Sequence, residues 1–298
     1  MSVFVKKSTD AGAPVVTGAV GGAIALFDFL LVTTLGWTKA FVNAANSVAA
    51  YKQPAGTNGF YLRVDASNAS YLRLVGYEAM TAIDVGTGAF PTAAQASGGL
   101  YQSTEAAATA VQWRFYSNGK IFYLFITAGS YWQPIVFGDI NSYKASDAFG
   151  TVLIAANSTG NTYNTFSMMM SSLSSVPAAH YLARTAAQTG VAVACGKLSD
   201  YTRSNNSAHI GQGGVAYPSP IEGGLLMAPV WVAEANLGAR GLLPGVWNPL
   251  HNQPLANGDT FTGVGGLNGR TFDVQSCLTT SGNYAQVFME TSDTWGEP

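Results

Sequence analysis

The side chains that could carry chemistry in this chain are few and far apart. The three histidines, His180, His209 and His251, have no second ligand at a metal-binding spacing. The sequence contains no Gly-x-Ser-x-Gly elbow, His-Glu-x-x-His helix or Gly-x-x-x-x-Gly-Lys-Ser/Thr phosphate loop. Its 16 acidic residues are scattered singly, so the sequence does not nominate a carboxylate pair, roughly 5 to 10 Å apart, of the kind that a glycoside hydrolase needs. We therefore predict neither a catalytic site nor a metal site.

Two further features resemble functional motifs without their context. Cys195 and Cys277 lack CxxC spacing, which favours buried free thiols and leaves a single disulfide between them open. The glycine-rich residues 263–269 have the wrong spacing for a dinucleotide loop and no strand–helix context, so they predict a turn. We expect no bound cofactor.

The composition limits the classes of partner. Of 298 residues 48% are hydrophobic and only 10% are charged, whereas ordinary domains have about 25% charged residues. A net charge of -2 and a pI near 5.9 give no electrostatic attraction for nucleic acid. A surface this poor in charge favours association, so we predict that part of it is buried in an assembly. A neutral surface rich in Ser, Thr, Gly and Asn is the alternative.

The N-terminal region has neither a signal peptide nor a membrane span by its pattern. No apolar run follows Lys6 and Lys7 directly. The apolar block at residues 19–32 is interrupted by Asp28 and is shorter than the roughly 20 residues that a spanning helix requires.

The elements expected to organise the fold are hairpins, and the clearest covers residues 111–127. Two runs of β-favouring residues flank Asn118-Gly119, a pair typical of a two-residue type I′ turn. Such a turn would place Phe115 opposite Phe122 and Trp113 opposite Leu124 on an apolar face. The other face is aromatic and amphipathic, and we expect it to be at least half covered.

A second hairpin is predicted from the alternating residues 59–64 and 70–75, in which Arg63 and Arg73 would lie on partly exposed faces and form ion pairs or cation–π contacts. Residues 19–32 predict a helix that is apolar nearly all round. Such a helix must be buried between two surfaces, one of which we assign to a neighbouring subunit that the N-terminal arm would reach.

The chain as a whole predicts a mainly β protein of antiparallel, hairpin-built sheets, sandwich-like or barrel-like, with one buried N-terminal helix. We divide it into residues 1–35 (arm and helix), 36–156 (first β region), 157–176 (a Ser/Thr/Asn-rich linker or long loop) and 177–298 (second β region). Pro229 predicts an edge or a bulge in its strand. The proline-punctuated residues 240–251 predict no long regular element.

Several stretches of the chain resemble virion structural proteins of tailed bacteriophages. The resemblance spans nearly the whole chain, and its motifs are turns and strand edges at residues 8–14, 36–39, 60–65, 76–80, 137–139, 240–245 and 290–295. It implies a non-enzymatic component of the tail or baseplate, located in a virion assembled in the host cytoplasm, with copies of itself and other virion proteins as partners. A capsid-surface or decoration protein and a module that binds a host-surface glycan remain open alternatives.

The residues most suited to anchor such contacts are apolar and aromatic side chains of the helix and of irregular loops. The interface candidates are Leu26, Phe27, Phe29, Leu30, Tyr131, Trp132, Val246 and Trp247.

Overall fold

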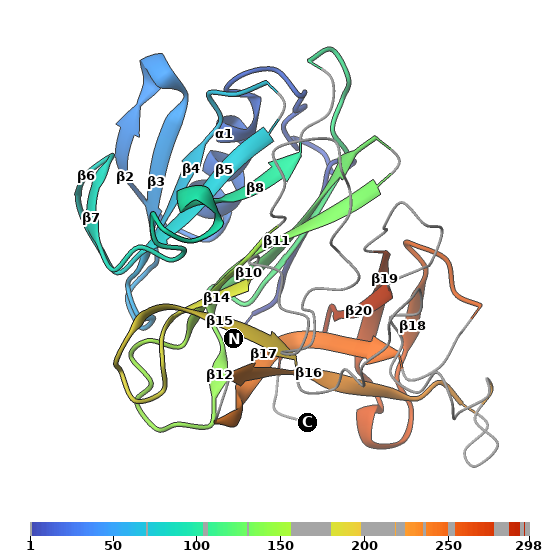
Figure 1. Cartoon of the computed structure of the whole chain (residues 1–298). Coiled ribbons are helices and arrows are strands. Elements are labelled where there is room, and N and C mark those ends of the chain that lie inside the picture. The colour runs from blue at the N-terminus through green and yellow to red at the C-terminus, as the bar shows by residue number, and fades with distance from the viewer. Residues whose placement is uncertain are drawn as a thin grey trace.

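Figure 1 shows the computed structural model of the chain. As predicted, it is mainly β with antiparallel sheets, and its described residues contain one α-helix. The structure describes residues 2–69, 71–103, 107–129, 131–155, 180–197, 218, 224–234, 237–249, 254–276, 286–292 and 295. No helix among these residues is long and apolar enough to cross a membrane.

The larger sheet has 13 strands, and its described pairings are all antiparallel. In spatial order they are β1 (Phe4–Lys7), β9 (Trp113–Ser117), β10 (Ile121–Ala128), β11 (Tyr131–Asp139), β13 (Thr151–Ile154), β14 (His180–Arg184), β15 (Val191–Lys197), β16 (Met227–Glu234), β17 (Gly238–Pro249), β20 (Gln286–Glu290), β19 (Thr271–Ser276) and β18 (Thr260–Thr262), with β12 (Asn141–Ser142) paired to β17. The sheet does not close into a barrel. It bends so that the half from β1 to β14 faces the half from β16 to β20 (Figure 1).

A second sheet of five strands lies beside the first half of the larger one. Its order is β2 (Thr38–Asn43), β3 (Val48–Lys52), β4 (Tyr61–Asp65), β5 (Tyr71–Tyr77) and β8 (Leu100–Ser103), and a small hairpin of β6 (Ala79–Ala82) and β7 (Val85–Thr87) follows β5. The predicted hairpin between β4 and β5 is confirmed, with Val64 opposite Leu74. Short 3₁₀ turns occupy Ala44–Asn46, Ala96–Gly98 and Gly265–Leu267.

The predicted N-terminal helix is present as α1 (Gly22–Phe27) and continues as a π-helical segment, η1 (Asp28–Thr34). It lies between the two sheets. Phe27 stacks on Tyr51 of β3 at 6.0 Å and contacts Phe122 of β10 edge-on at 6.5 Å. The helix is therefore buried between two surfaces, but both belong to its own chain and neither to a neighbouring subunit as predicted.

The N-terminal arm likewise folds onto its own chain. Strand β1 pairs with β9, placing Phe4 opposite Ser117 and Lys7 opposite Arg114. One edge of the arm is thus hydrogen-bonded within the chain, and contact of the arm with a neighbouring subunit stays a prediction.

The central hairpin of β9 and β10 forms as predicted, but its register differs by two residues. Ser117 lies opposite Phe122, and Phe115 opposite Leu124. The cause is Asn118, whose side-chain Oδ1 accepts hydrogen bonds from the backbone N–H groups of Lys120 (3.0 Å) and Ile121 (3.1 Å). Asn118 therefore begins a longer loop instead of occupying the centre of a two-residue turn.

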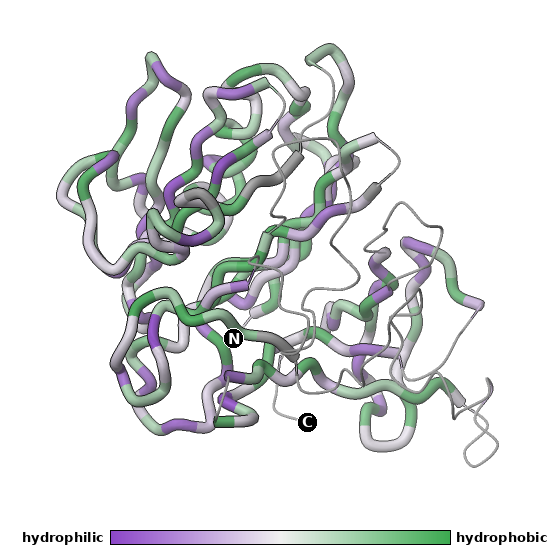
Figure 2. The backbone as a smooth tube through the Cα atoms, viewed as in Figure 1, coloured by the Kyte–Doolittle hydropathy of each residue, from purple (hydrophilic) through white to green (hydrophobic). Residues whose placement is uncertain are grey.

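The assignment of side chains to faces survives this shift, since moving a strand by two residues preserves its alternation. Trp113, Phe115 and Phe122 point into the core between the two sheets, whereas Tyr116 and Tyr123 point into the core enclosed by the bent larger sheet. All eight residues of β10 are buried, and Figure 2 shows hydrophobic residues along this central strand. A third, smaller cluster contains Trp247, Phe272, Val274 and Phe288.

The second half of the chain corrects one prediction and confirms another. Residues 238–249 form β17, a 12-residue strand, although prolines and glycines argued against a long element. The strand tolerates them because its pairing with β16 is irregular: Val230 lies opposite Leu243, but Pro229 lies opposite Trp247. Residues 244–246 of β17 have no partner in β16 there, so the pairing is irregular beside Pro229 as predicted, but the extra residues belong to the neighbouring strand.

The strands of the larger sheet come from both predicted β regions. β13 pairs with β14 across the predicted linker at residues 157–176, which lies outside the described residues. The domain boundaries themselves stay predictions.

Candidate functional site

The residues singled out for chemistry do not gather in the described structure. No group of three or more His, Cys, Asp and Glu residues able to hold a metal ion occurs among the described positions. His180 is buried in β14, while His209 and His251 lie outside the described residues. Residues 263–269 connect β18 to β19, with the backbone N–H of Gly263 donating to Arg270 O at 2.7 Å, so they form a turn as predicted.

Cys195 is a buried free thiol, as expected, and Cys277 lies outside the described residues. Burial raises the pKa of the Cys195 thiol to about 12, although the charge of nearby Arg240 opposes this shift. A thiol of this kind is inert near neutral pH because the thiolate is the reactive form.

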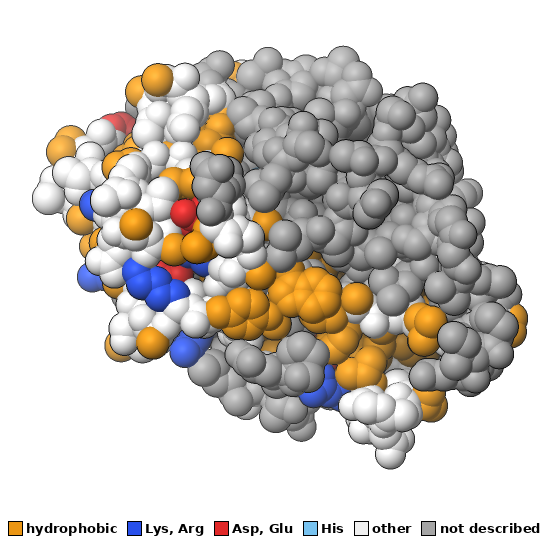
Figure 3. Space-filling view, turned by 60° about the horizontal axis from the view of Figure 1, so that its bottom comes forward, with side chains coloured by type: hydrophobic (Ala, Val, Ile, Leu, Met, Phe, Trp, Pro, Cys, Tyr) orange, Lys and Arg blue, Asp and Glu red, His pale blue; other side chains and the backbone are white. Residues whose placement is uncertain are grey.

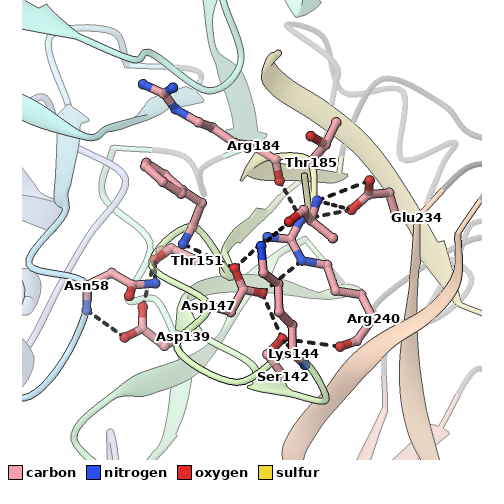
Figure 4. Close-up of polar contacts among 12 residues, drawn as sticks. Asn58, Asp139, Ser142, Lys144, Asp147, Thr151, Arg184, Thr185, Glu234 and Arg240 are labelled. Carbon is pink, nitrogen blue, oxygen red and sulfur yellow. Dashed lines mark hydrogen bonds and ion pairs between the residues drawn. The ribbon is translucent and has the colours of Figure 1, made fainter. Parts of the chain in front are cut away.

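The most developed polar cluster centres on Arg240 at the start of β17 (Figure 4). Its side chain is 0% exposed. Nε and Nη2 donate to the two carboxylate oxygens of Asp147 at 2.9 Å each, and Nη1 donates to Glu234 Oε2 at 2.9 Å. Nη1 also donates to the backbone carbonyl of Arg184. One guanidinium thus binds two carboxylates and a carbonyl in the interior.

The elements that supply this cluster are far apart in the sequence. Asp147 belongs to the loop between β12 and β13, and Glu234 ends β16. Glu234 also accepts a hydrogen bond from the backbone N–H of Ala186 at 2.9 Å, and Lys144 Nζ donates to Ala186 O. The cluster therefore ties the 140–150 loop and the β14–β15 turn to the β16–β17 hairpin.

The electrostatics of Asp147 are set by these contacts. Burial alone would raise the pKa of its carboxyl, but hydrogen bonds from Arg240 and Ser142 and the charge of Arg240 together lower it below the ordinary value of 3.8. Asp147 is consequently an anion at neutral pH, stabilised where it lies.

A second cluster at Asp139, the last residue of β11, joins the two sheets (Figure 4). Its carboxylate accepts hydrogen bonds from Thr151 Oγ1 (2.7 Å), Gln53 Nε2 (3.1 Å) and the backbone N–H of Asn58 (2.8 Å). Gln53 and Asn58 precede β4 of the five-stranded sheet, so this carboxylate fixes that sheet to the larger one.

A third contact holds the sheets together nearer the surface. Arg184 of β14 binds both oxygens of Glu78 at 2.6 Å each, and its guanidinium lies 4.6 Å from the ring centre of Phe149. Arg63 pairs with Asp65 and Asp84, which confirms the predicted ion pairing for this arginine, whereas Arg73 donates to the Gly98 carbonyl.

The carboxylates of Asp65 and Asp147 hold loops and do not have the properties of a general acid. A general acid needs a raised pKa and access to substrate. The pKa values of Asp65 and Asp147 are lowered, although burial alone would raise both, because hydrogen bonds and arginine charge outweigh it. Burial raises the pKa of Glu290, but its side chain is only 1% exposed.

The structure places most interface candidates inside the chain. Leu26, Phe27, Leu30, Val246 and Trp247 are at most 5% exposed and pack in the cores. Phe29 is half-buried against Trp113, and Trp132 is half-buried beneath Arg114; Tyr131 is the first residue of β11. An interface anchor must be accessible in the isolated chain, so Phe29 and Trp132 are the described side chains of this set that retain that property.

Sequence reasoning missed Arg240 and Asp147, which lie 93 residues apart. The sequence signal that could have revealed this ion pair was Arg240, a charged residue in an otherwise apolar run, because a buried charge requires a partner. Nothing in the sequence indicated which carboxylate would supply it. Comparison with known proteins adds no assignment, since neither a protein-family model nor a curated protein matches the chain.

Proposed function

We propose that this chain is a non-enzymatic structural subunit of a tailed-bacteriophage virion, in the tail or baseplate, that assembles through apolar contacts with copies of itself and with other virion proteins. The link to a virion rests on the sequence resemblance described above. The proposed mode of action rests on how the chain uses its charges.

The observation that carries the proposal is that the few charged groups pair with one another. The chain has 14 basic and 16 acidic residues, and 14 of these 30 form the eight ion pairs seen among the described residues. Figure 3 shows a face on which hydrophobic side chains gather below the centre, with Lys and Arg side chains at the margin of this group. Pairing of this kind reduces the uncompensated charge that would oppose association.

The polar cross-links between the loops and sheets also support a structural role. The Arg240 and Asp139 clusters and the Arg184–Glu78 pair tie loops and sheets into one body. A subunit that holds a geometry benefits from such cross-links, because its contact surface is then preorganised for binding.

The test begins with the purified full-length chain in size-exclusion chromatography with light scattering. We expect oligomers that persist in 1 M NaCl, since apolar contacts are not screened by salt. Val42 (56% exposed), Val85 (58%) and Val264 (75%) are accessible on different elements, and single Val→Glu changes there should dissociate the oligomer only where the contact lies.

The virion assignment is tested on purified particles by mass spectrometry and by gold labelling of a tagged subunit in electron microscopy. A chain that is monomeric at every concentration and absent from particles would refute the proposal. Deleting residues 1–32 is not a usable test, because it removes β1 and the buried residues Leu26, Phe27, Leu30 and Leu31 and would unfold the chain.

A further inference from the structure

Arg114 of β9 lies where the two ends of the larger sheet approach each other. It points to the same side as Lys7, its direct cross-strand neighbour on β1. Trp132 of β11 lies beneath its guanidinium, with the ring centre 5.1 Å from Cζ. Asn257 and Gln275 come from the other end of the sheet. Arg114, Trp132, Lys7 and Asn257 are half-buried, so this group of side chains, the Arg114 site, is open to solvent.

The Arg114 site has one more cation than anion. Like charges directly opposite each other on neighbouring strands destabilise a sheet, yet Lys7 and Arg114 are so placed. Asp273 Oδ2 is the nearby carboxylate oxygen, and it binds Lys7 Nζ at 3.1 Å and the Tyr116 hydroxyl at 3.0 Å. Arg114 therefore has no carboxylate of its own among the described residues.

The lack of a carboxylate partner distinguishes Arg114 from most of the described arginines. Four of the six described arginines, Arg63, Arg184, Arg240 and Arg270, form an ion pair with at least one carboxylate. Arg270 is the closest match to Arg114, since it also lies over a tryptophan, with 5.9 Å to the ring centre of Trp247, but it has Glu290 as its counter-ion.

Arg114 interacts with the Tyr116 hydroxyl, and the contacts that its Nη1 makes are long. Nη1 lies 3.4 Å from Asn257 Oδ1, 3.5 Å from Val274 O and 3.4 Å from Gln275 Oε1, all longer than the usual 2.7–3.2 Å. Gly258 allows the guanidinium to lie against the backbone, because a Cβ at this position would be 2.7 Å from Nη2. The planar fork is thus oriented by Trp132 and Gly258 but lacks the partner that such a fork fits best.

We infer that the Arg114 site binds the carboxylate of an acidic sugar of the uronic-acid class. The guanidinium fork and Lys7 supply charge and donors for the planar carboxylate, and the amide N–H₂ of Asn257 can donate to a hydroxyl oxygen. Trp132 supplies an aromatic surface beside them, which suits the C–H face of a pyranose ring. This inference does not rest on the assembly role proposed above, but it requires that Trp132, an accessible interface candidate, is not covered in that assembly.

The inference is tested by ligand-observed NMR and calorimetry on the full-length protein with D-glucuronate, D-glucose, acetate and inorganic phosphate. We expect glucuronate to bind and the other three to bind at least tenfold more weakly. Arg114→Gln should weaken glucuronate binding at least tenfold, whereas Arg270→Gln, the matched control, should leave it unchanged.

A second variant protects the test against a folding defect in Arg114→Gln. Asn257→Asp retains the oxygen that accepts from the Ser276 backbone N–H at 2.9 Å and gives Arg114 an internal counter-ion, so it should also abolish binding while leaving thermal unfolding unchanged. The inference is overturned if wild type does not bind glucuronate, if acetate or phosphate binds equally well, or if Asn257→Asp binds like wild type.

Discussion

Replacing Arg240 by methionine removes one cation from between two carboxylates in the interior. The side chains of Arg240, Asp147 and Glu234 are 0%, 2% and 7% exposed. Methionine fills similar volume, so the change leaves little cavity but leaves both carboxylates without their counter-ion. We expect a large loss of stability caused by charge and not by packing.

The magnitude follows from the cost of breaking a buried ion pair. Removing one partner of such a pair costs about 3–5 kcal/mol, and Arg240 serves two carboxylates. We therefore expect a loss toward the upper end of that range. For a chain of this size the melting temperature falls by roughly 2–4 °C per kcal/mol. Urea unfolding followed by tryptophan fluorescence and circular dichroism measures the loss.

The stability difference between wild type and Arg240→Met should depend on pH. In wild type the lowered pKa of Asp147 adds stability that is present above the ordinary value of 3.8 and is lost as pH falls through the folded-state pKa. Without Arg240, burial raises the pKa of Asp147 instead, so protonation favours the folded variant. The stability difference between wild type and Arg240→Met should consequently shrink between pH 7 and pH 4.

A combined variant separates charge from packing. Adding Asp147→Asn and Glu234→Gln to Arg240→Met neutralises the whole cluster, while the new amide oxygen at position 234 can still accept from the Ala186 N–H, and most of the lost stability should return. A loss below about 1 kcal/mol for Arg240→Met at pH 7, or a deficit that grows on acidification, would contradict the reasoning.

Three further predictions concern single positions. Gly138→Ala should destabilise the chain by more than about 2 kcal/mol, on the scale of about 1–3 kcal/mol for backbone strain, because the new Cβ would lie 2.3 Å from Ile121 Cα. Gly119→Ala should cost less because the space around its Cβ is open, and equal melting temperatures of the two variants would contradict this reasoning. Leu30→Ala should cost about 2–5 kcal/mol in urea unfolding, because Leu30 is 0% exposed between the sheets, and a loss under about 1 kcal/mol would mean that the helix is not packed there. In a Cys277→Ser background, Cys195 should react with a thiol reagent at pH 8 only after unfolding, since burial raises its pKa to about 12; rapid labelling of the native protein would contradict its placement.

The side of each strand that is apolar follows from the residue pattern of the chain alone. Alternation is a local property of the chain, and it survives even when the register changes by two residues, as it does between β9 and β10. For the same reason the all-round apolar pattern at residues 19–32 was sufficient to predict burial on two sides. It could not tell whose surfaces cover the helix, because amphipathicity contains no information about the identity of a partner.

The register of the central hairpin, the path of β17 and the polar sites depend on contacts that form only in the folded chain. The register depends on hydrogen bonds that the Asn118 side chain makes in the folded turn. Strand β17 continues past Pro244 because Trp247 pairs with Pro229 of β16 and with Phe288 of β20. The hydroxyl of Tyr123, 121 residues away, donates to the Pro244 carbonyl at 2.9 Å. The Arg240 cluster joins the β12–β13 loop and the β14–β15 turn to the β16–β17 hairpin, and the Arg114 site joins residues from opposite ends of the bent sheet. Contacts of this kind depend on how sheets curve and meet, and that is set by the packing of the whole chain and not by any local pattern.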